Sequence, residues 1–148
     1  MQLNFATTVS FSAAAVCLSL ATLGGFLGRN ASSRHFLHAA ASGATAGVYC
    51  LTNATIAGGM GVEVTVWAGR VGLLAACLHP AAWLFFLSAW DRRPLGPLCR
   101  ALICASTLAG LAALVPGWAV LDSTTIRAKK GTNAAIVVLP GGKIVARG

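Results

Sequence analysis

Acidic residues are nearly missing from this sequence, whose 148 residues include only Glu63, Asp91 and Asp122. Charged residues of both signs make up 9% of the chain, whereas an average soluble domain contains roughly 25%. So little charge cannot cover the surface of a soluble fold of this length. It also leaves almost no groups for general acid–base catalysis. With no phosphate-binding loop or nucleophile elbow in the chain, we expect no enzyme activity and no catalytic residues.

Metal-binding cysteine motifs are also lacking. The five cysteines are scattered through apolar stretches, and no two of them have the Cys-x-x-Cys spacing. We interpret them as small apolar packing residues and expect no metal site and no cofactor.

Positive charge, by contrast, is present, and its distribution is informative. The chain carries a net charge of +8 from eleven lysines and arginines. They lie between apolar blocks or in the C-terminal tail, rather than along one face. This placement favours residues that flank a membrane and argues against nucleic acid as a partner.

Hydrophobic residues make up 57% of the chain and gather in four long blocks. Because about 20 mostly apolar residues cross a bilayer as a helix, each block is long enough to cross once. The predicted helices are 5–27, 36–56, 64–90 and 98–121. Short polar or glycine-rich links separate them, which favours antiparallel neighbours. The sequence therefore predicts an all-α integral membrane protein, with a four-helix up-and-down bundle over residues 1–121.

The remaining residues, 122–148, form a polar and basic tail. Two short β-type runs within 134–146 flank the sequence Pro140-Gly-Gly-Lys143, which predicts a β-hairpin. Because an isolated hairpin is marginally stable, we expect this one to pack against another element or partner.

The distribution of arginines predicts an orientation. Five arginines flank the first and third links, whereas the second link has none: Arg29, Arg34, Arg92, Arg93 and Arg100. Positive residues near short loops favour the cytoplasm, so both termini are expected outside it. The basic residues at 127, 129 and 130 favour the opposite orientation.

Arg70 is the one charge inside the third apolar block, and such a charge needs a partner or an interfacial position. Trp67 and Glu63 precede it on roughly the same helical face, so Arg70 is expected to stack on the Trp67 ring and reach towards Glu63. One interpretation is a polar ligand or anionic lipid contact near the outer interface. The other is an interfacial anchor of Trp and Arg.

His79 lies at the middle of the same block beside Pro80. Two interpretations remain open for His79. Either it ligates a metal, haem or pigment, or it hydrogen-bonds a carbonyl that the proline leaves unpaired.

Small residues recur at four-residue spacing in several blocks and predict close helix packing. The candidate packing glycines are Gly24, Gly28, Gly43, Gly47 and Gly72.

The sequence Trp67-Ala-Gly-Arg70, the aromatic-rich stretch 79–87 and the basic exit at 91–93 together resemble a known membrane module. They resemble the third helix of the seven-helix N-terminal sensor module of bacterial histidine kinases of the exosortase-associated type. The resemblance implies the bacterial inner membrane, with Trp67, Arg70 and Pro80 as the matching positions. The chain lacks phospho-acceptor and ATP-binding boxes, so kinase activity is not implied. It would correspond to the sensing part, truncated after the fourth helix.

Two functions of different classes follow. The first is a non-catalytic accessory subunit of a larger respiratory, photosynthetic or transport complex. Its partners would be membrane lipids and the other integral membrane subunits of that complex. The second is a sensor or signal-relay module like the kinase input domain.

Overall fold

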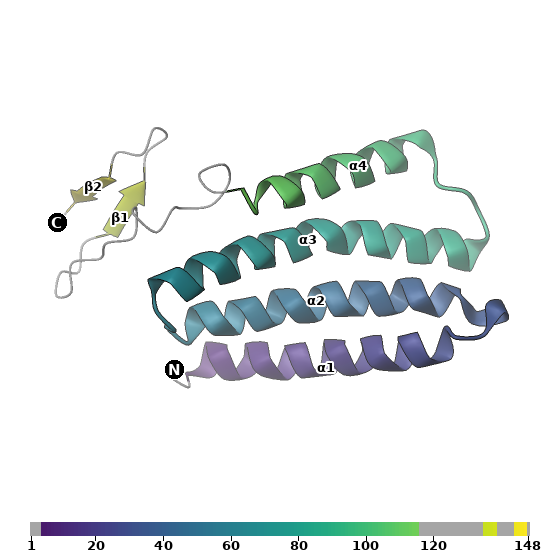
Figure 1. Ribbon diagram of the computed structural model, residues 1–148, viewed down its shortest axis with the longest axis horizontal. Coiled ribbons are helices and arrows are strands. Elements are labelled where there is room, and N and C mark those ends of the chain that lie inside the picture. Colours follow the sequence, from purple (N-terminus) through teal and green to yellow (C-terminus); the bar gives the residue numbers. More distant parts are fainter. Residues whose placement is uncertain (1–3, 116–134, 139–143, 148) are drawn as a thin grey trace.

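The computed structural model describes residues 4–115, 135–138 and 144–147 (Figure 1). This part of the chain contains four α-helices, as predicted, together with one 3-10 turn and two short strands. The elements are α1 (Phe5–Leu27), η1 (Ala31–Ser33), α2 (His35–Ala57), α3 (Val62–Asp91), α4 (Pro97–Ala112), β1 (Ala135–Val138) and β2 (Ile144–Arg147). The first three helices agree with their predicted ranges to within two residues.

The predicted end of the fourth helix is wrong. The range 98–121 was expected, whereas α4 ends at Ala112 and closes in a tight turn in which the Val115 N–H donates to the Ala112 carbonyl. Residue 116 is a proline, which has no N–H to continue the helical ladder and disfavours helical backbone at the residue before it. The apolar character of the block continues past this proline, and residues 116–121 of the predicted range lie outside the described residues.

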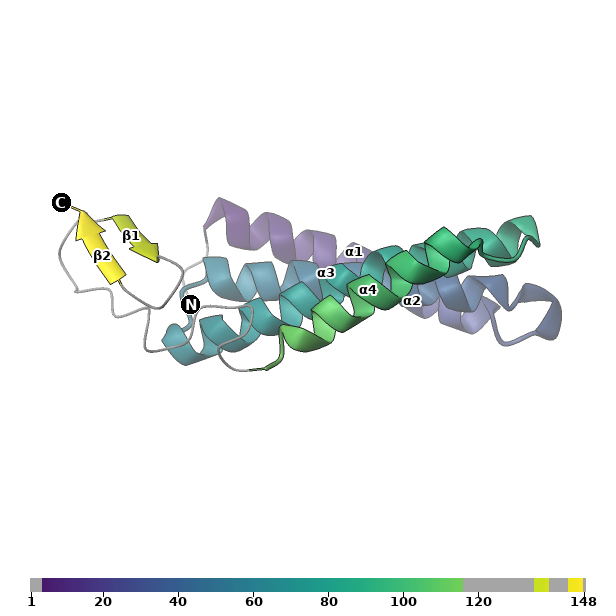
Figure 2. The same cartoon turned by 90° about the horizontal axis from the view of Figure 1, so that it is seen from above.

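The four helices run up and down, and they lie in a row (Figure 1). α1 packs on α2, α2 on α3 and α3 on α4, and no comparable contact joins α1 to α3 or α4 in the described residues. Seen from above, the helices overlap one behind another (Figure 2). The predicted bundle is therefore open, since α1 and α4 each pack against a single helix.

The interior of the row consists of small residues. Of the buried residues in the described helices and links, all except Val66 and Arg70 are Gly, Ala, Ser or Thr. The large apolar side chains point outwards, including Leu20 at 61% and Leu108 at 67% exposed. A water-soluble helical protein has the opposite distribution.

Glycines bring the helices into contact. A Cβ on Gly28, which caps the end of α1, would lie 2.9 Å from the backbone nitrogen of Leu37, and one on Gly43 of α2 would lie 3.1 Å from the carbonyl oxygen of Cys17. Gly24, Gly47 and Gly72 also face the neighbouring helix, where an added Cβ would lie 3.1 Å, 2.8 Å and 2.6 Å from the nearest atom of that helix. All five candidate packing glycines thus lie at α1–α2 or α2–α3 contacts.

Two helices are long and apolar enough to cross a membrane, Phe5–Leu27 and Glu63–Asp91. α4 is apolar but has only 16 residues. α2 has 23 residues, the same length as α1, but carries two histidines and several Ser, Thr and Asn side chains.

β1 and β2 pair antiparallel, with Ala135 opposite Arg147 and Val138 opposite Ile144. The predicted turn at 140–143 lies outside the described residues.

Candidate functional site

Arg70 lies about two turns from the start of α3 and is only 5% exposed. Its guanidinium carbon lies 5.1 Å from the centroid of the Trp67 ring, a cation–π contact between residues three apart on one helix. The Nε atom of Arg70 is buried and has no hydrogen-bond partner. Burying a charged donor without a partner is costly, so this guanidinium is incompletely satisfied within the described chain.

Glu63 does not fill this role. The structure gives no ion pair between Arg70 and Glu63; the one ion pair in the described residues joins Arg93 to Asp91 at 3.9 Å, with both side chains exposed. Glu63 lies seven residues before Arg70, a rise of about 10 Å along the helix. The predicted reach of Arg70 towards Glu63 is therefore wrong.

Glu63 and Trp67 instead line an open groove of about 450 Å³ between α2 and the first half of α3. The rest of its lining comes from both helices: Leu51, Thr52 and Thr55 of α2, and Val64, Ala68 and Val71 of α3. The groove is mostly apolar, with one carboxylate at its rim. It can accept an apolar side chain or a lipid chain.

Helix geometry gives the position of Arg70 along the helix axes, relative to the end of α4. A Cβ on Gly110 of α4 would touch Leu74 and Cys77 of α3, so those two residues face α4. Arg70 is one turn before Leu74 on the same face of α3. Because α4 runs antiparallel and ends at Ala112, Arg70 is at the level where α4 stops.

His79 belongs to a second polar cluster, between α2 and α3. Its Nδ1 atom is 3.1 Å from the carbonyl oxygen of Ser42 and 3.2 Å from the Thr45 hydroxyl. The Ser42 carbonyl can only accept, so Nδ1 carries a proton in this contact. The Thr45 hydroxyl donates within α2, to the carbonyls of Ala41 and Ser42, so its lone pairs also face the imidazole N–H.

This contact differs from the expected one. The carbonyl that Pro80 deprives of a partner belongs to Ala76, four residues earlier on α3. His79 instead donates to the Ser42 carbonyl of α2. Its hydrogen bond therefore links α2 to α3 and does not satisfy the unpaired carbonyl within α3. Ser42 and Thr45 were not among the predicted site residues, although a Ser-x-x-Thr pair within an apolar helix signals a polar helix face.

Within residues 4–115 and the two strands, no three His, Cys, Asp or Glu side chains gather closely enough to hold a metal ion. The arrangement around Arg70 has a cation, an aromatic face and an apolar groove, which suit contact with an anion or a partner helix rather than proton-transfer chemistry. Compared with known protein families, curated proteins and solved structures, the chain matches none.

Proposed function

We propose that this chain is an integral membrane protein, an accessory subunit whose open row of helices packs against other membrane-embedded helices. The observation that carries the proposal is the buried, incompletely satisfied Arg70 at the level where α4 ends. A second subunit that offers an anionic or carbonyl group at this level would complete its coordination.

Membrane insertion is supported by the placement of small residues inside and large apolar residues outside. In lipid, helices associate through close packing of small residues, while large apolar side chains face the acyl chains. α1 and α3 meet the requirement of length and apolarity directly.

α2 and α4 complete a proposed set of four crossings. α2 lies between α1 and α3, and its polar Ser42, Thr45 and Thr52 all face α3 or their own backbone. Its polarity is thereby largely hidden from lipid. α4 covers about 24 Å, which local thinning of the bilayer accommodates.

The proposed orientation has both termini outside the cytoplasm. The link containing η1 and the link between α3 and α4 lie at one end of the row, and the glycine-rich link 58–61 lies at the other (Figure 1). The first end carries Arg29, Arg34, Arg92 and Arg93, and 58–61 carries no basic residue. Positive residues at one end of a helix row favour the cytoplasmic side.

A sensor module is the second candidate, favoured by the groove that Glu63 and Trp67 line beside Arg70. In that role the groove would take a lipid or apolar signal. The resemblance to kinase input modules supports the same proposal.

The test isolates the full chain from its native membrane in mild detergent, alongside Arg70→Leu and Arg100→Leu. Arg100 is exposed near the start of α4. Arg100→Leu is therefore the matched control, because it removes the same charge from a position that is not buried. We expect the wild-type chain and Arg100→Leu to migrate within a larger assembly of stoichiometric composition, and Arg70→Leu to insert but migrate alone. A wild-type chain that migrates alone would contradict the subunit role. If the Arg70→Leu chain still migrates within the assembly, Arg70 does not bind the partner subunit and serves only as an interfacial anchor.

A further inference from the structure

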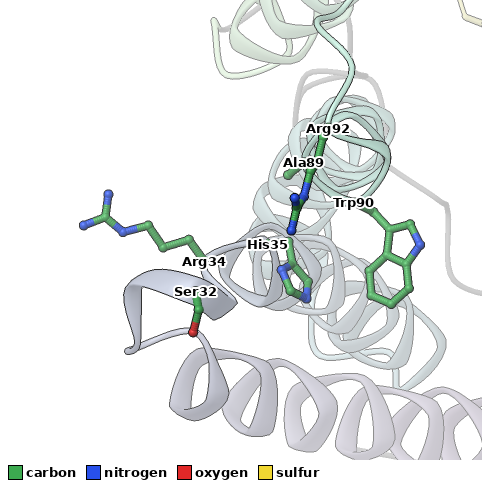
Figure 3. Close-up of a pocket in the computed structure, with 6 residues that line it drawn as sticks. All are labelled: Ser32, Arg34, His35, Ala89, Trp90 and Arg92. Atoms are coloured by element: carbon green, nitrogen blue, oxygen red, sulfur yellow. The ribbon is translucent and has the colours of Figure 1, made fainter.

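A pocket of about 420 Å³ lies at the arginine-rich end of the row, between the start of α2 and the end of α3 (Figure 3). It is lined by Ser32, Arg34, His35, Ala89, Trp90 and Arg92. It is at the opposite end of α3 from the groove beside Arg70.

The cations of this pocket are uncompensated. Arg34 and Arg92 make no ion pair in the described residues, and the nearby carboxylate of Asp91 pairs with Arg93 instead. The start of α2 adds to the positive potential, because its first turn has no acidic residue and no side-chain cap. An anion is therefore the ligand that this pocket suits.

The fold fixes the positions of these groups. Arg92 caps α3 in the left-handed conformation, with φ of 53°, and its backbone N–H donates to the Ser88 carbonyl. The ring of His35 meets that of Trp90 edge-on, with centroids 5.3 Å apart, so α2 and α3 are in contact beneath the pocket. In Figure 3 the Arg92 side chain extends from the end of α3 towards His35, while Arg34 extends outwards from the start of α2.

The surroundings point to a phosphate group carried on a lipid. The Arg92 guanidinium reaches towards His35, and Arg34 and Ser32 line the edge of the pocket, so their guanidinium and hydroxyl donors are available to phosphate oxygens. Trp90, 61% exposed, presents its ring beside the pocket, and an indole ring favours the level of lipid headgroups. The Trp90 ring contacts that of Phe86 (centroids 5.8 Å apart), which contacts that of Trp83 (5.4 Å), so an aromatic surface continues along α3 away from the pocket. An acyl chain could follow this surface while its headgroup occupied the pocket.

We propose that this pocket binds the phosphate group of an anionic phospholipid of the cytoplasmic leaflet. The inference rests on the proposed membrane location but not on the accessory-subunit role. Basic pockets between transmembrane helices on the cytoplasmic side are suited to such headgroups.

The test measures binding of phosphatidylglycerol and of phosphatidylcholine to the purified full-length chain in neutral detergent, by native mass spectrometry. The pocket variant is the double change Arg34→Gln and Arg92→Gln. The matched control is Arg29→Gln with Arg93→Gln, which removes the same charge at the same end of the row but outside the pocket lining. A further arm adds sodium phosphate as a competitor. Carbonate extraction of the membranes and circular dichroism of each variant report insertion and folding separately.

We expect the wild-type chain to prefer phosphatidylglycerol, and the pocket variant to lose about tenfold or more in its affinity while the control stays within about threefold. Equal losses in both double variants would overturn the pocket and leave only general surface charge. Displacement of the lipid by millimolar phosphate would overturn the lipid assignment in favour of a soluble phosphate compound. Failure of carbonate extraction to retain the wild-type chain would refute the membrane location itself, which distinguishes the two proposals.

Discussion

The side-chain amide of Asn4 donates a hydrogen bond of 3.1 Å from Nδ2 to the carbonyl oxygen of Ala57, the last residue of α2. Its Oδ1 accepts from the backbone N–H of Thr7 at 2.8 Å, which caps the start of α1. One side chain thus satisfies an unpaired N–H of one helix and an unpaired C=O of its neighbour.

Changing Asn4 separates these two contacts. We expect Asn4→Ala to lower the free energy of unfolding by about 1–2 kcal/mol, since it removes both the cap and the contact to Ala57. Asn4→Asp keeps the cap but cannot donate to Ala57, so its loss is expected to be smaller. Unfolding in mixed micelles measures both. Equal stability of Asn4→Asp and the wild-type chain would show that the Ala57 contact contributes nothing.

Glycine packing between α1 and α2 can be tested with two neighbouring residues. Gly28→Ala places a Cβ 2.9 Å from the Leu37 backbone nitrogen, whereas Gly25→Ala meets nothing within 4 Å. We expect Gly28→Ala to destabilise the chain by about 1–3 kcal/mol through overpacking. Gly25→Ala should be neutral or slightly stabilising because alanine favours helix. Similar effects of the two changes in a thermal unfolding assay would contradict the close contact at Gly28.

Arg70→Leu is expected to have opposite effects on the isolated chain and on its assembly. Without a partner the buried guanidinium is poorly compensated, so leucine should stabilise the isolated chain by about 1–3 kcal/mol. Unfolding of the purified protein measures this, with Arg100→Leu as the exposed control. A destabilised Arg70→Leu chain would indicate that Arg70 is already satisfied within the protein.

The His79 cluster predicts a tautomer. Nitrogen-15 NMR of labelled histidine should show His79 protonated at Nδ1, because the Ser42 carbonyl accepts there. Thr45→Val removes the second acceptor and should cost about 0.6 kcal/mol, the usual size for polar contacts between membrane helices. Thr55→Val is the control, since the Thr55 hydroxyl bonds only to the Leu51 carbonyl of its own helix. A His79 protonated at Nε2 would contradict the assignment.

Topology is tested by labelling single cysteines in a cysteine-free chain. Asn30→Cys is expected to react only from the cytoplasmic side and Met60→Cys only from outside, since both residues are exposed at opposite ends of the row. The reverse pattern would invert the orientation without affecting the fold.

The sequence predicted the parts of the fold that local signals control. Arg29 and the glycines of 58–61 mark helix ends, so the first three helices were predicted closely. The end of α4 at Ala112 was missed because the hydropathy of the block stays high through Pro116, whereas this proline disfavours helical backbone in the residue before it. The open row was also missed, since short links make successive helices antiparallel but do not determine whether the first meets the last.

The same division applies to the site. Trp67 and Arg70 are three residues apart on one helix, so their stacking follows from helical spacing alone. The meeting of His79 with Ser42 and Thr45 depends on how α3 slides along α2, and no local pattern in either helix contains that register. Arg34 and Arg92 are 58 positions apart in the sequence, and they meet at one pocket only because α3 returns to the end of the row where α2 begins.

The row also has a consequence for biogenesis. Each helix packs mainly on the helix made just before it, so the contacts of the fold are close in sequence and the topology favours rapid assembly. α1 and α2 can join, with Asn4 already bonded to Ala57, before α3 has left the ribosome. α3 and then α4 can be added to an existing edge in the order of their synthesis, and none has to wait for a helix not yet made.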